Sequence, residues 1–491
     1  MLTFIDNFLN KITMYRLVLY ILAILASLGI IFSFIGILPY SGLMFIASSI
    51  FIITICFFFN IIFSRIFKAP TNIESVYITA FILILIVSPV QNWSDFFYWG
   101  FLFWVSILSM ASKYIVAINK KHIFNPASLA LVITAFTLGH SANWWIGTLV
   151  MLPFTAVGGF LIVRKIQRFD LVLTFILSAL ISIFLSREFN LNTDINLAKQ
   201  IILYSPIIFF STIMLTEPST TPPKKIGRIF YGAITGILFS PAIHIASVYS
   251  TPELSLLVGN IFSYLISPKE RLVLRLKEKV KVAKNTYDFV FEPDQKIKFR
   301  PGQYLEWTLG HKNPDTRGNR RYFTIASSPT EGNIRLGVKF YPNGSTFKQN
   351  LLKMEGGGVS TASQLSGEFT LPNDVNKKLV FLAGGIGITP FRSIIKYLLD
   401  NGEKRNIVML YSNRTPEDVA YRKILEEAQT KLGLKTVYTV TDANIPEATW
   451  QGKTGIIDEK MLKEAAFFGE NLKLTGAGNG SPTKPRCLIK E

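Results

Sequence analysis

The sequence predicts three parts: a polytopic α-helical membrane domain of about ten spans (1–268), an antiparallel β-barrel (269–374) and an α/β domain of Rossmann type (375–491). Three observations carry this prediction. Long apolar stretches with few charges fill the first half of the chain. After Lys269 the pattern changes to the two-residue alternation of half-buried strands. From about Lys377, strands alternate with helices, as in a parallel sheet covered by helices.

The apolar stretches of the first half are long enough, or nearly so, to cross about 30 Å of hydrocarbon. The shorter ones make the count of ten good to about one span. The predicted spans are 17–38, 43–64, 74–90, 96–117, 123–138, 144–163, 169–186, 200–215, 229–248 and 253–267.

The positive charges of the first half gather in alternate loops. They are Lys11, Arg16, Arg65, Lys68, Lys113, Lys120, Lys121, Arg164, Lys165, Arg168, Lys224, Lys225 and Arg228. Only Arg187 and Lys199 break the pattern. Because basic loops stay in the cytoplasm, both termini are expected there, in a multi-pass protein of the inner (cytoplasmic) membrane.

The composition narrows the class of partner. The net charge is +19, and both halves of the chain share the basic surplus. This balance favours anionic lipid headgroups and phosphate-bearing cofactors over nucleic acid. With only two cysteines, Cys56 and Cys487, neither a disulfide framework nor a four-cysteine iron–sulfur cluster is expected.

The histidines of the first half do not predict haem. His122, His140 and His244 are not paired at a spacing that would hold haem between helices. His122 and His140 are expected in solvated loops, and His244, in a span, is more often a structural residue than a ligand. No metal site is predicted.

Two proline-containing segments interrupt the apolar pattern, K-H-I-F-N-P-A-S at Lys121–Ser128 and T-E-P-S-T-T-P-P at Thr216–Pro223. Proline breaks the helical hydrogen-bond ladder, and irregular backbone at membrane depth needs protein or water partners. One interpretation is a cofactor or ion site at helix breaks. The other is a pair of helix ends near the membrane interface, and the residues alone do not decide between them.

Four motifs in residues 70–268 carry a resemblance: F-N-P-A-S-L-A-L-V, W-W-I-G-T, M-L-T-E-P-S-T-T-P and Y-G-A-I-T-G. They resemble the NqrB/RnfD family, whose members are membrane proteins of the sodium-translocating NADH:quinone reductase and of the Rnf electron-transport complex. The resemblance implies flavin in the membrane. Because the S-G-A-T motif of covalent FMN attachment is absent, a non-covalent FMN, riboflavin or quinone site stays open.

The middle of the chain has the pattern of a small Greek-key barrel. Leu272–Glu292 alternates as two strands, and P-G-Q-Y at Pro301–Tyr304 predicts a turn into another strand. R-Y-F-T-I-A-S-S-P follows at Arg321–Pro329.

The last part alternates strands and helices. Strands are predicted at Leu379–Ala383, Ile407–Ser412 and Thr436–Thr441, with helices at Phe391–Leu399 and Val419–Leu432. After the first strand, G-G-I-G-I-T-P at Gly384–Pro390 is a glycine-rich loop. Such a loop lets backbone approach a pyrophosphate at a helix N-terminus.

A barrel followed by a parallel sheet, with these motifs in order, is similar to the ferredoxin–NADP reductase superfamily over residues 270–470. The resemblance implies FAD on the barrel, with Arg321 on the pyrophosphate. Phe323 would flank the isoalloxazine and Thr324 would hydrogen-bond its N5 edge, so both are placed at the reacting ring. Tyr322 belongs to the same motif, and Tyr304 is a second-rank neighbour. The alternative is a surface arginine on an ordinary strand.

The same resemblance implies two phosphate-binding segments. Gly344, Ser345 and Thr346 would serve the FAD phosphates. Gly384, Gly385, Gly387, Thr389 and Pro390 would bind NADH or NADPH. Arg414 either reaches a 2′-phosphate, which would favour NADPH, or is a solvated loop residue.

The C-terminal stretch departs from that superfamily, whose members finish with a Gly-Pro strand and a helix beside the nicotinamide. Here Leu474–Gly478 is the expected remnant of the strand, no helix pattern follows, and Cys487 does not match the family's cysteine. A naturally shortened enzyme and a shifted reading frame both stay open.

The predicted function is a membrane-bound, FAD-dependent NAD(P)H oxidoreductase. Electrons would pass through FAD to a flavin or quinone-like acceptor at the membrane domain, or to a partner redox protein. The alternatives are a component of an ion pump driven by electron transfer, and a non-catalytic membrane partner with a decayed nicotinamide site.

Overall fold

The computed structural model describes residues 2–67, 73–118, 121–185, 199, 201, 203–267, 271–311, 314–315, 318–442, 450–466, 474–475 and 488–490. The chain divides into two compact units. The helical unit comprises residues 8–270, and the sheet unit comprises residues 1–7 and 271–491. Lys68, Lys120, Arg187 and Cys487, which entered the sequence predictions, lie outside the described residues.

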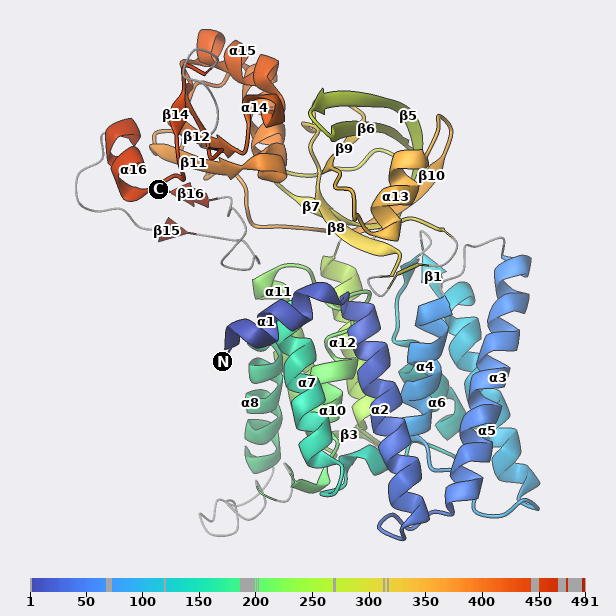
Figure 1. Ribbon diagram of the computed structural model, residues 1–491. Coiled ribbons are helices and arrows are strands. Elements are labelled where there is room, and N and C mark those ends of the chain that lie inside the picture. The colour runs from blue at the N-terminus through green and yellow to red at the C-terminus, as the bar shows by residue number, and fades with distance from the viewer. Residues whose placement is uncertain are drawn as a thin grey trace. The chain divides into compact units, whose positions relative to one another are not determined.

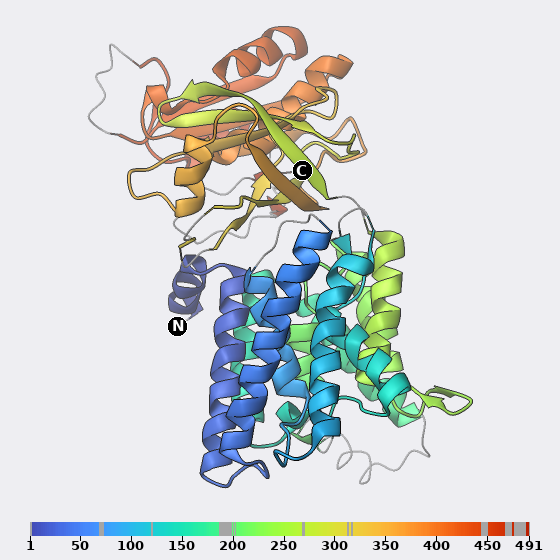
Figure 2. The ribbon, with the colours of Figure 1, turned by 90° about the vertical axis from the view of Figure 1, so that its right-hand side faces the viewer.

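The helical unit is a bundle whose longer helices run side by side (Figures 1 and 2). Its α-helices are α2 (Met14–Phe34), α3 (Gly42–Ile66), α4 (Ile73–Ile86), α5 (Phe96–Ile115), α6 (Pro126–Leu138), α7 (Leu152–Ile166), α8 (Phe169–Leu185), α10 (Ile207–Phe209), α11 (Lys225–Leu238) and α12 (Pro252–Ile266). Helix α1 (Leu2–Lys11) precedes them. The unit also has a 3-10 turn, η1 (Trp145–Gly147), a π-helical turn, η2 (Phe210–Met214), and two short hairpins, β1–β2 (Ala117–Ile118, Lys121–His122) and β3–β4 (His244–Ile245, Val248–Tyr249).

Each predicted span overlaps a helix, but the count of ten stays a prediction. Among the described residues, α2 and α3 combine the length and apolar composition of a membrane span. Helices α4, α6, α8 and α12 are apolar but shorter.

The predicted span 229–248 is wrong in its second half. Helix α11 ends at Leu238, and the β3–β4 hairpin follows. Pro241, which lacks a backbone N–H, stands in the turn after the helix. His244 is therefore exposed on a hairpin, where its Nδ1 lies 3.1 Å from the carbonyl oxygen of Ala246.

The two proline-containing segments meet in space. Asn125, the N-cap of α6, donates from Nδ2 to Glu217 Oε2 at 2.8 Å. The backbone N–H of Asn125 donates to Asn260 Oδ1 at 2.8 Å, and Asn260 donates to the Tyr231 hydroxyl at 3.0 Å. The expectation that His122 is solvated is wrong, because its Nε2 lies 3.4 Å from Glu217 Oε1. The helix breaks are thus joined by a polar cluster, made of His122, Asn125, Glu217, Tyr231 and Asn260, in which Asn125, Tyr231 and Asn260 are buried.

The first sheet of the sheet unit is a curled, six-stranded antiparallel sheet (Figure 1). Its order is β8-β7-β10-β5-β6-β9. The strands are β5 (Leu272–Ala283), β6 (Thr286–Pro293), β7 (Tyr304–Thr308), β8 (Arg320–Thr324), β9 (Ile334–Lys339) and β10 (Val359–Ser366), and helix α13 (Thr346–Lys353) lies between β9 and β10. Leucine, isoleucine and aromatic side chains, Trp307 among them, fill its core.

The P-G-Q-Y turn before β7 requires its glycine. Gly302 has φ +95°, and a Cβ there would collide with the carbonyl oxygen of Phe369. The turn predicted from the sequence therefore also brings the segment after β10 close to the barrel.

The second sheet has the order β14-β13-β12-β11-β16-β15. Strands β11 (Leu379–Gly384), β12 (Ile407–Asn413), β13 (Lys435–Val440) and β14 (Lys453–Thr454) are parallel. The helical elements are η3 (Gly385–Ile388), α14 (Thr389–Asn401), η4 (Pro416–Asp418), α15 (Arg422–Leu432) and α16 (Glu459–Ala466). The predicted strands agree to within a residue, and the second predicted helix begins three residues later than expected.

The C-terminal strands are arranged differently from the expected remnant. Leu474–Thr475 is a strand, β15, but it pairs with β16 (Leu488–Lys490) rather than with β11. Strand β16 occupies the place next to β11 and runs antiparallel to it. Residues 476–478 of the expected strand lie outside the described residues.

Candidate functional site

The arginine motif forms strand β8, which pairs with the strand that follows the P-G-Q-Y turn. Tyr304 lies opposite Thr324, and the rings of Tyr304 and Tyr322 are 5.8 Å apart. Successive side chains of a strand point to opposite faces. Thr324 therefore shares its face with Tyr322 and Tyr304, which are 49% and 36% exposed. The structure thus puts an open aromatic surface beside Thr324.

Phe323 lies on the other face of β8. It packs against the barrel core, with its ring 5.8 Å from that of Phe347 in α13. Its predicted place against the isoalloxazine, like the N5 role of Thr324, stays a prediction. Tyr322 and Tyr304, which the sequence also predicted near the cofactor, are the more exposed aromatic groups of this strand pair.

Arg321 lies beside the start of α13. Its guanidinium carbon is 5.3 Å from the centre of the Phe347 ring, and its NH2 lies 3.6 Å from Asp315 Oδ1. NH1 donates to the backbone carbonyls of Gly318 and Arg320 at 3.2 and 2.6 Å. These contacts hold the guanidinium in one place, where a cation beside a helix N-terminus favours an anion.

The turn Gly344–Ser345–Thr346 forms the N-terminus of α13. Ser345 is the N-cap, and its hydroxyl accepts from the Lys348 N–H at 3.3 Å. The Thr346 N–H donates to Asp315 Oδ2 at 3.1 Å, and the Thr346 hydroxyl accepts from the Asp315 N–H at 2.9 Å.

These contacts provide a test of whether the residues fit the pyrophosphate of FAD. The two carboxylate oxygens of Asp315 stand in for phosphate oxygens: one meets the helix N-terminus and the other meets Arg321. The α13 N-terminus and Arg321 therefore already bind a pair of anionic oxygens. This arrangement of donors fits the phosphate group that the barrel is expected to hold.

The glycine loop follows β11 as a single 3-10 turn that leads into α14. Gly385 has φ +51°, a backbone conformation that favours glycine, and a Cβ there would meet no atom within 4 Å. The Tyr411 hydroxyl donates to the Gly385 carbonyl at 3.1 Å, and burial raises the pKa of Tyr411, so the hydroxyl keeps its proton. The Tyr411 hydroxyl thus holds the backbone of the turn, and the side of Gly385 where a side chain would stand is open.

The remaining residues of the loop complete the start of α14. Gly384 ends β11, and Gly387 lies inside the 3-10 turn. Thr389 begins the helix, and its hydroxyl donates to the Ile386 carbonyl at 3.3 Å. Pro390, in the first helical turn, has no N–H to leave unsatisfied.

Arg414 follows strand β12 at its carboxyl end. Its side chain is 80% exposed, and its Nε lies 3.9 Å from Asp442 Oδ2. An arginine at the carboxyl end of the strand that follows the glycine loop is a group that can receive a 2′-phosphate. Asp442 follows β13, one strand farther along, which is not where a ribose-binding acid is expected. The choice between NADH and NADPH stays open.

Sequence reasoning missed a largely buried cluster of charged and hydroxyl groups between the two sheets: Asp288, Glu331, Arg335, Arg392 and Tyr421. Asp288 and Tyr421 are 133 positions apart in the sequence. No local pattern predicts such a pairing. A charged residue in the first turn of a helix otherwise rich in apolar residues, Arg392, is the only hint.

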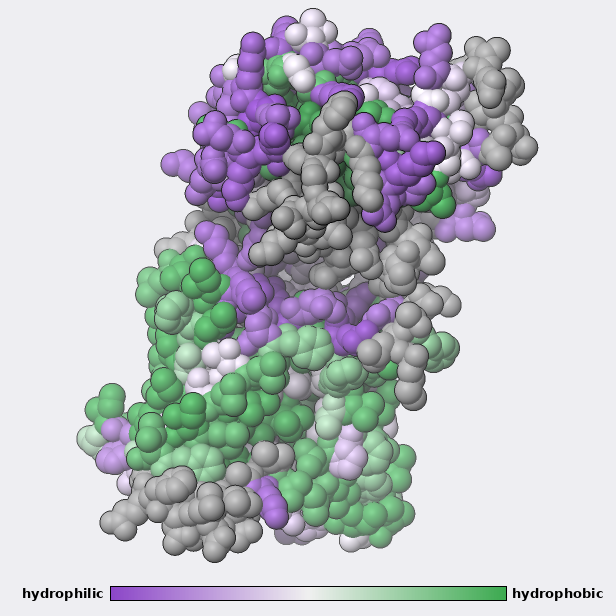
Figure 3. Space-filling view, turned by 90° about the vertical axis from the view of Figure 1, so that its left-hand side faces the viewer, coloured by the Kyte–Doolittle hydropathy of each residue, from purple (hydrophilic) through white to green (hydrophobic). Residues whose placement is uncertain are grey.

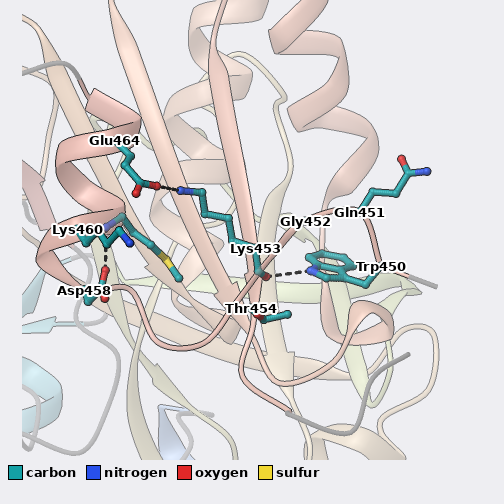
Figure 4. A pocket seen from close by; sticks show the side chains of 9 residues that line it. Trp450, Gln451, Gly452, Lys453, Thr454, Asp458, Lys460 and Glu464 are labelled. Atoms are coloured by element: carbon teal, nitrogen blue, oxygen red, sulfur yellow. Dashed lines mark hydrogen bonds and ion pairs between the residues drawn. The ribbon is translucent and has the colours of Figure 1, made fainter. Parts of the chain in front are cut away.

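A cavity of about 600 Å³ lies at the edge of the second sheet, beside β14 and α16 (Figure 4). None of the predicted cofactor residues lines it. Several of its polar groups have partners: Trp450 Nε1 donates to the Lys453 carbonyl, Lys453 pairs with Glu464, and Asp458 accepts from the Met461 N–H. It is separate from the glycine loop.

A second cavity, of about 260 Å³, lies in the helical unit. Its walls include Leu131, Ala135 and Phe136 of α6. Glu253, which is buried, lines it and accepts from Trp144 Nε1 at 2.9 Å. Among the described residues, no group of three His, Cys, Asp or Glu side chains is placed to hold a metal ion.

Two family models match the sheet unit. The oxidoreductase FAD-binding domain matches residues 273–362, and the oxidoreductase NAD-binding domain matches residues 381–478. Neither match extends into residues 1–268.

Similar proteins include a flavohemoprotein of Candida albicans, 32% identical, with 42% of this chain and 49% of the relative covered. Nitrate reductase [NADH] 1 of Arabidopsis thaliana is 30% identical (43% and 25%), and NADH-cytochrome b5 reductase 1 of Mortierella alpina is 28% identical (40% and 66%). The chain spans about half the length of the first of these relatives and a quarter of the second.

Among solved structures, the cytochrome b5 reductase domain of Ulva prolifera nitrate reductase is 24% identical, with 42% of this chain and 85% of that chain covered and a TM-score of 0.36. The Amycolatopsis cytochrome P450 reductase GcoB is 21% identical (40% and 58%), with a TM-score of 0.35.

Proposed function

We propose that the whole chain is a membrane-bound enzyme. The premise is that its second half is an NAD(P)H-dependent, FAD-containing oxidoreductase similar to ferredoxin–NADP reductase. The enzyme passes electrons from NADH or NADPH through FAD to an acceptor held by the helical unit. The observation that carries the proposal is one compact unit that holds, in order, the contact of Arg321 with Asp315 at the start of α13 and the open turn at Gly385.

The residues of the sheet unit would divide the work of binding and orientation. Arg321 and the N-terminus of α13 would hold the FAD pyrophosphate. Because β8 is the edge strand of its sheet, the ring system would lie around this edge, bordered by Tyr304, Tyr322 and Thr324 on the face opposite Arg321. The Gly385 turn would hold the coenzyme phosphates. FAD, when bound, supplies the hydride chemistry and can release electrons singly.

The surface and length of the bundle support a membrane location. Helices α2 and α3 are 21 and 25 residues long. Large apolar side chains, such as Ile24, Ile50, Phe58 and Leu177, are exposed on several helices. Figure 3 shows a mostly hydrophobic surface over this unit. Exposed apolar area of this extent is typical of contact with lipid. A protein that leaves the membrane fraction in alkaline carbonate would contradict this location.

The acceptor is proposed to be a flavin or a quinone-like ring in the helical unit, or a partner redox protein that docks there. The 260 Å³ cavity supports the ring, because its walls combine apolar side chains of α6 with hydroxyl groups, among them those of Ser141 and Ser247, that can donate to the polar oxygens of a ring. Neither FMN nor riboflavin is needed in addition to FAD for the first step.

An absorbance spectrum of the detergent-solubilised protein tests this function. We expect a flavin spectrum that bleaches when NADH or NADPH is added without oxygen, and no haem bands. A colourless protein would contradict the flavin assignment. A yellow protein that neither coenzyme reduces would favour the non-catalytic alternative.

A second function, ion translocation driven by the electron flow, is favoured by the polar cluster of the helical unit. Glu217 and Asn260 lie where two helix breaks meet, and polar groups at membrane depth often mark ion pathways. Turnover that depends on sodium, with charge movement in vesicles, would support it. Turnover that is indifferent to the cation would contradict it.

A further inference from the structure

The cluster of Asp288, Glu331, Arg335, Arg392 and Tyr421 joins the barrel to the α/β domain inside the sheet unit. Asp288 lies on β6, Arg335 on β9, and Glu331 just before β9. Arg392 lies on α14, and Tyr421 directly precedes α15. Each domain therefore contributes its own side chains to the cluster.

The contacts form a continuous chain across the boundary. The Tyr421 hydroxyl donates to Asp288 Oδ1 at 3.0 Å, and Arg335 NH1 donates to Asp288 Oδ2 at 3.1 Å. Arg335 Nε lies 3.3 Å from Glu331 Oε1. Arg392 then meets Glu331 with two nitrogens, one of them, NH2, at 2.8 Å.

Three of these five groups are buried, whereas the side chains of Glu331 and Arg335 are 13% and 24% exposed. Asp288 is 1% exposed, and Arg392 and Tyr421 are buried as well. Burial raises the pKa of Asp288 despite the two arginines, whereas the hydrogen bonds and charge of Arg392 outweigh burial and lower the pKa of Glu331. A buried charge pair with good geometry resists displacement, since losing one partner leaves the other uncompensated.

The cluster sits directly between the two cofactor segments. Ala326 and Ser327 follow Thr324 on the barrel, and they accept hydrogen bonds from Arg392 NH1 at 3.0 Å and from the Ser393 hydroxyl at 2.6 Å. Arg392 comes three residues after Thr389, at the end of the glycine loop. The strand that carries the arginine motif is thus tied, through a few bonds, to the helix that begins at the nicotinamide loop.

Two backbone features show that this fit is demanding. Tyr421 has φ +60°, which is uncommon for a bulky residue. Its ring lies under Arg392, 5.9 Å from the guanidinium carbon. Gly337 on β9 has no side chain, and a Cβ there would collide with the Tyr421 hydroxyl and lie 2.7 Å from Thr389 Cγ2. Strained backbone that the surroundings hold in place is a feature of sites where position matters.

We propose that this cluster is a positioning device: it fixes the separation and angle between the flavin strand β8 and the glycine loop, and so sets the rate of hydride transfer. The inference rests on the proposed function. The residues of the cluster are not themselves expected to contact FAD or the coenzyme. They would affect the positions of the residues that do, through β8, β9 and α14. An error of about 1 Å in the placement of reacting atoms costs on the order of 100-fold in rate.

The test uses Tyr421→Phe, which removes one hydroxyl and keeps the ring, and Glu331→Gln, which removes one charge. Tyr438→Phe is the matched control, because Tyr438 contacts Tyr411 and Arg422 within the α/β domain. Reduction of the flavin by excess NADH and NADPH is followed in a single turnover of the full-length protein. Coenzyme deuterated at C4 gives the isotope effect.

We expect Tyr421→Phe and Glu331→Gln to slow flavin reduction about tenfold and to change the isotope effect. FAD content and coenzyme affinity should stay within about twofold of wild type, and Tyr438→Phe should match wild type throughout. Variants that unfold more easily but keep the wild-type rate and isotope effect would overturn the positioning role. A wild-type protein that binds FAD but is reduced by neither coenzyme would overturn the proposed function and, with it, this inference.

Discussion

The barrel and the helical unit hold their buried polar groups in different ways. In the barrel, polar side chains at the expected cofactor segments stand at strand ends and helix starts, as Arg321 and Thr346 do. In the helical unit, polar side chains such as Asn125 and Glu217 lie where helices break. The first arrangement places donors at the segments expected to bind a ligand, whereas in the second the polar side chains bond mainly to one another. The barrel motifs therefore predict chemistry more directly than the apolar half does.

The largest expected effect breaks the anion site of the barrel. Arg321→Ala removes the guanidinium that meets Asp315 and lies beside the α13 N-terminus. We expect FAD affinity to fall about 100-fold, since a charge-assisted hydrogen bond is worth about 1.5–3 kcal/mol. FAD retained on gel filtration measures this. Arg275→Ala, an exposed change on β5, is the control. Retention of FAD by Arg321→Ala would contradict the assignment.

The next change tests the predicted coenzyme site separately from the predicted FAD site. Gly385→Trp would fill the open space above the glycine turn, with about 1 kcal/mol of backbone strain at φ +51°. We expect reduction by NADH and NADPH to be lost while FAD content and reduction by dithionite remain. Gly402→Trp, also at positive φ with open space but at the far end of α14, is the matched control. Unchanged reduction in Gly385→Trp would mean that the coenzyme binds elsewhere.

A change in the helical unit tests whether its polar cluster affects stability and electron transfer without affecting the sheet unit. Asn125→Ala removes the N-cap of α6 and the bond to Glu217, at a cost of about 1–2 kcal/mol. We expect a lower melting temperature in detergent and slower transfer to the acceptor. Flavin reduction by NADH, a property of the sheet unit, should not change. Asn92→Ala, in an exposed loop, is the control. Altered flavin reduction would show that the two units are not independent.

The cluster at the boundary between the barrel and the α/β domain should make the stability of the protein depend on pH. The pKa of Glu331 is lowered: burial alone would raise it, but its hydrogen bonds and charge contact with Arg392 prevail. The stabilisation is present above the ordinary glutamic acid pKa of about 4.3 and is lost as the pH falls through the lowered value. The contribution of Asp288 to stability changes with pH in the opposite direction, because its pKa is raised.

Glu331→Gln should therefore lower stability at pH 7 by about 1–2 kcal/mol and flatten the loss of stability between about pH 5 and pH 3. Release of flavin fluorescence on heating, measured across this range, checks it. Parallel curves for variant and wild type would show that another carboxyl dominates.

The smallest effect concerns the coenzyme. Arg414 is exposed and only loosely paired with Asp442, so Arg414→Ala should leave the KM for NADH unchanged. If Arg414 receives a 2′-phosphate, the KM for NADPH rises about two- to fivefold, the magnitude of a solvated charge contact. Equal KM values for wild type and variant with both coenzymes would assign Arg414 to the solvent.

Local signals explain most of what the sequence could predict. The Gly302 turn, the glycine loop and the alternation of β5 and β6 depend on neighbouring residues, so their patterns are visible in the chain. The end of α11 was misjudged because the apolar run continues past Pro241 into a hairpin.

Contacts between distant segments were not predictable. Tyr421 and Asp288 meet because the barrel and the α/β domain pack together, and neither residue carries a local motif. Asn125 and Glu217 are 92 positions apart, although both segments were recognised as irregular. Their meeting depends on the tertiary packing around the start of α6, where Asn260 of α12 also contacts Asn125, and no single window of sequence contains this packing.

The bare α-carbon of Gly337 has a practical consequence for protein engineering. Even a methyl group there would press on both Tyr421 and Thr389. A hybrid that grafts this α/β domain onto a foreign barrel must therefore keep a glycine at the matching position of the barrel strand. Compatibility of exchanged domains thus depends on this missing side chain in addition to overall similarity.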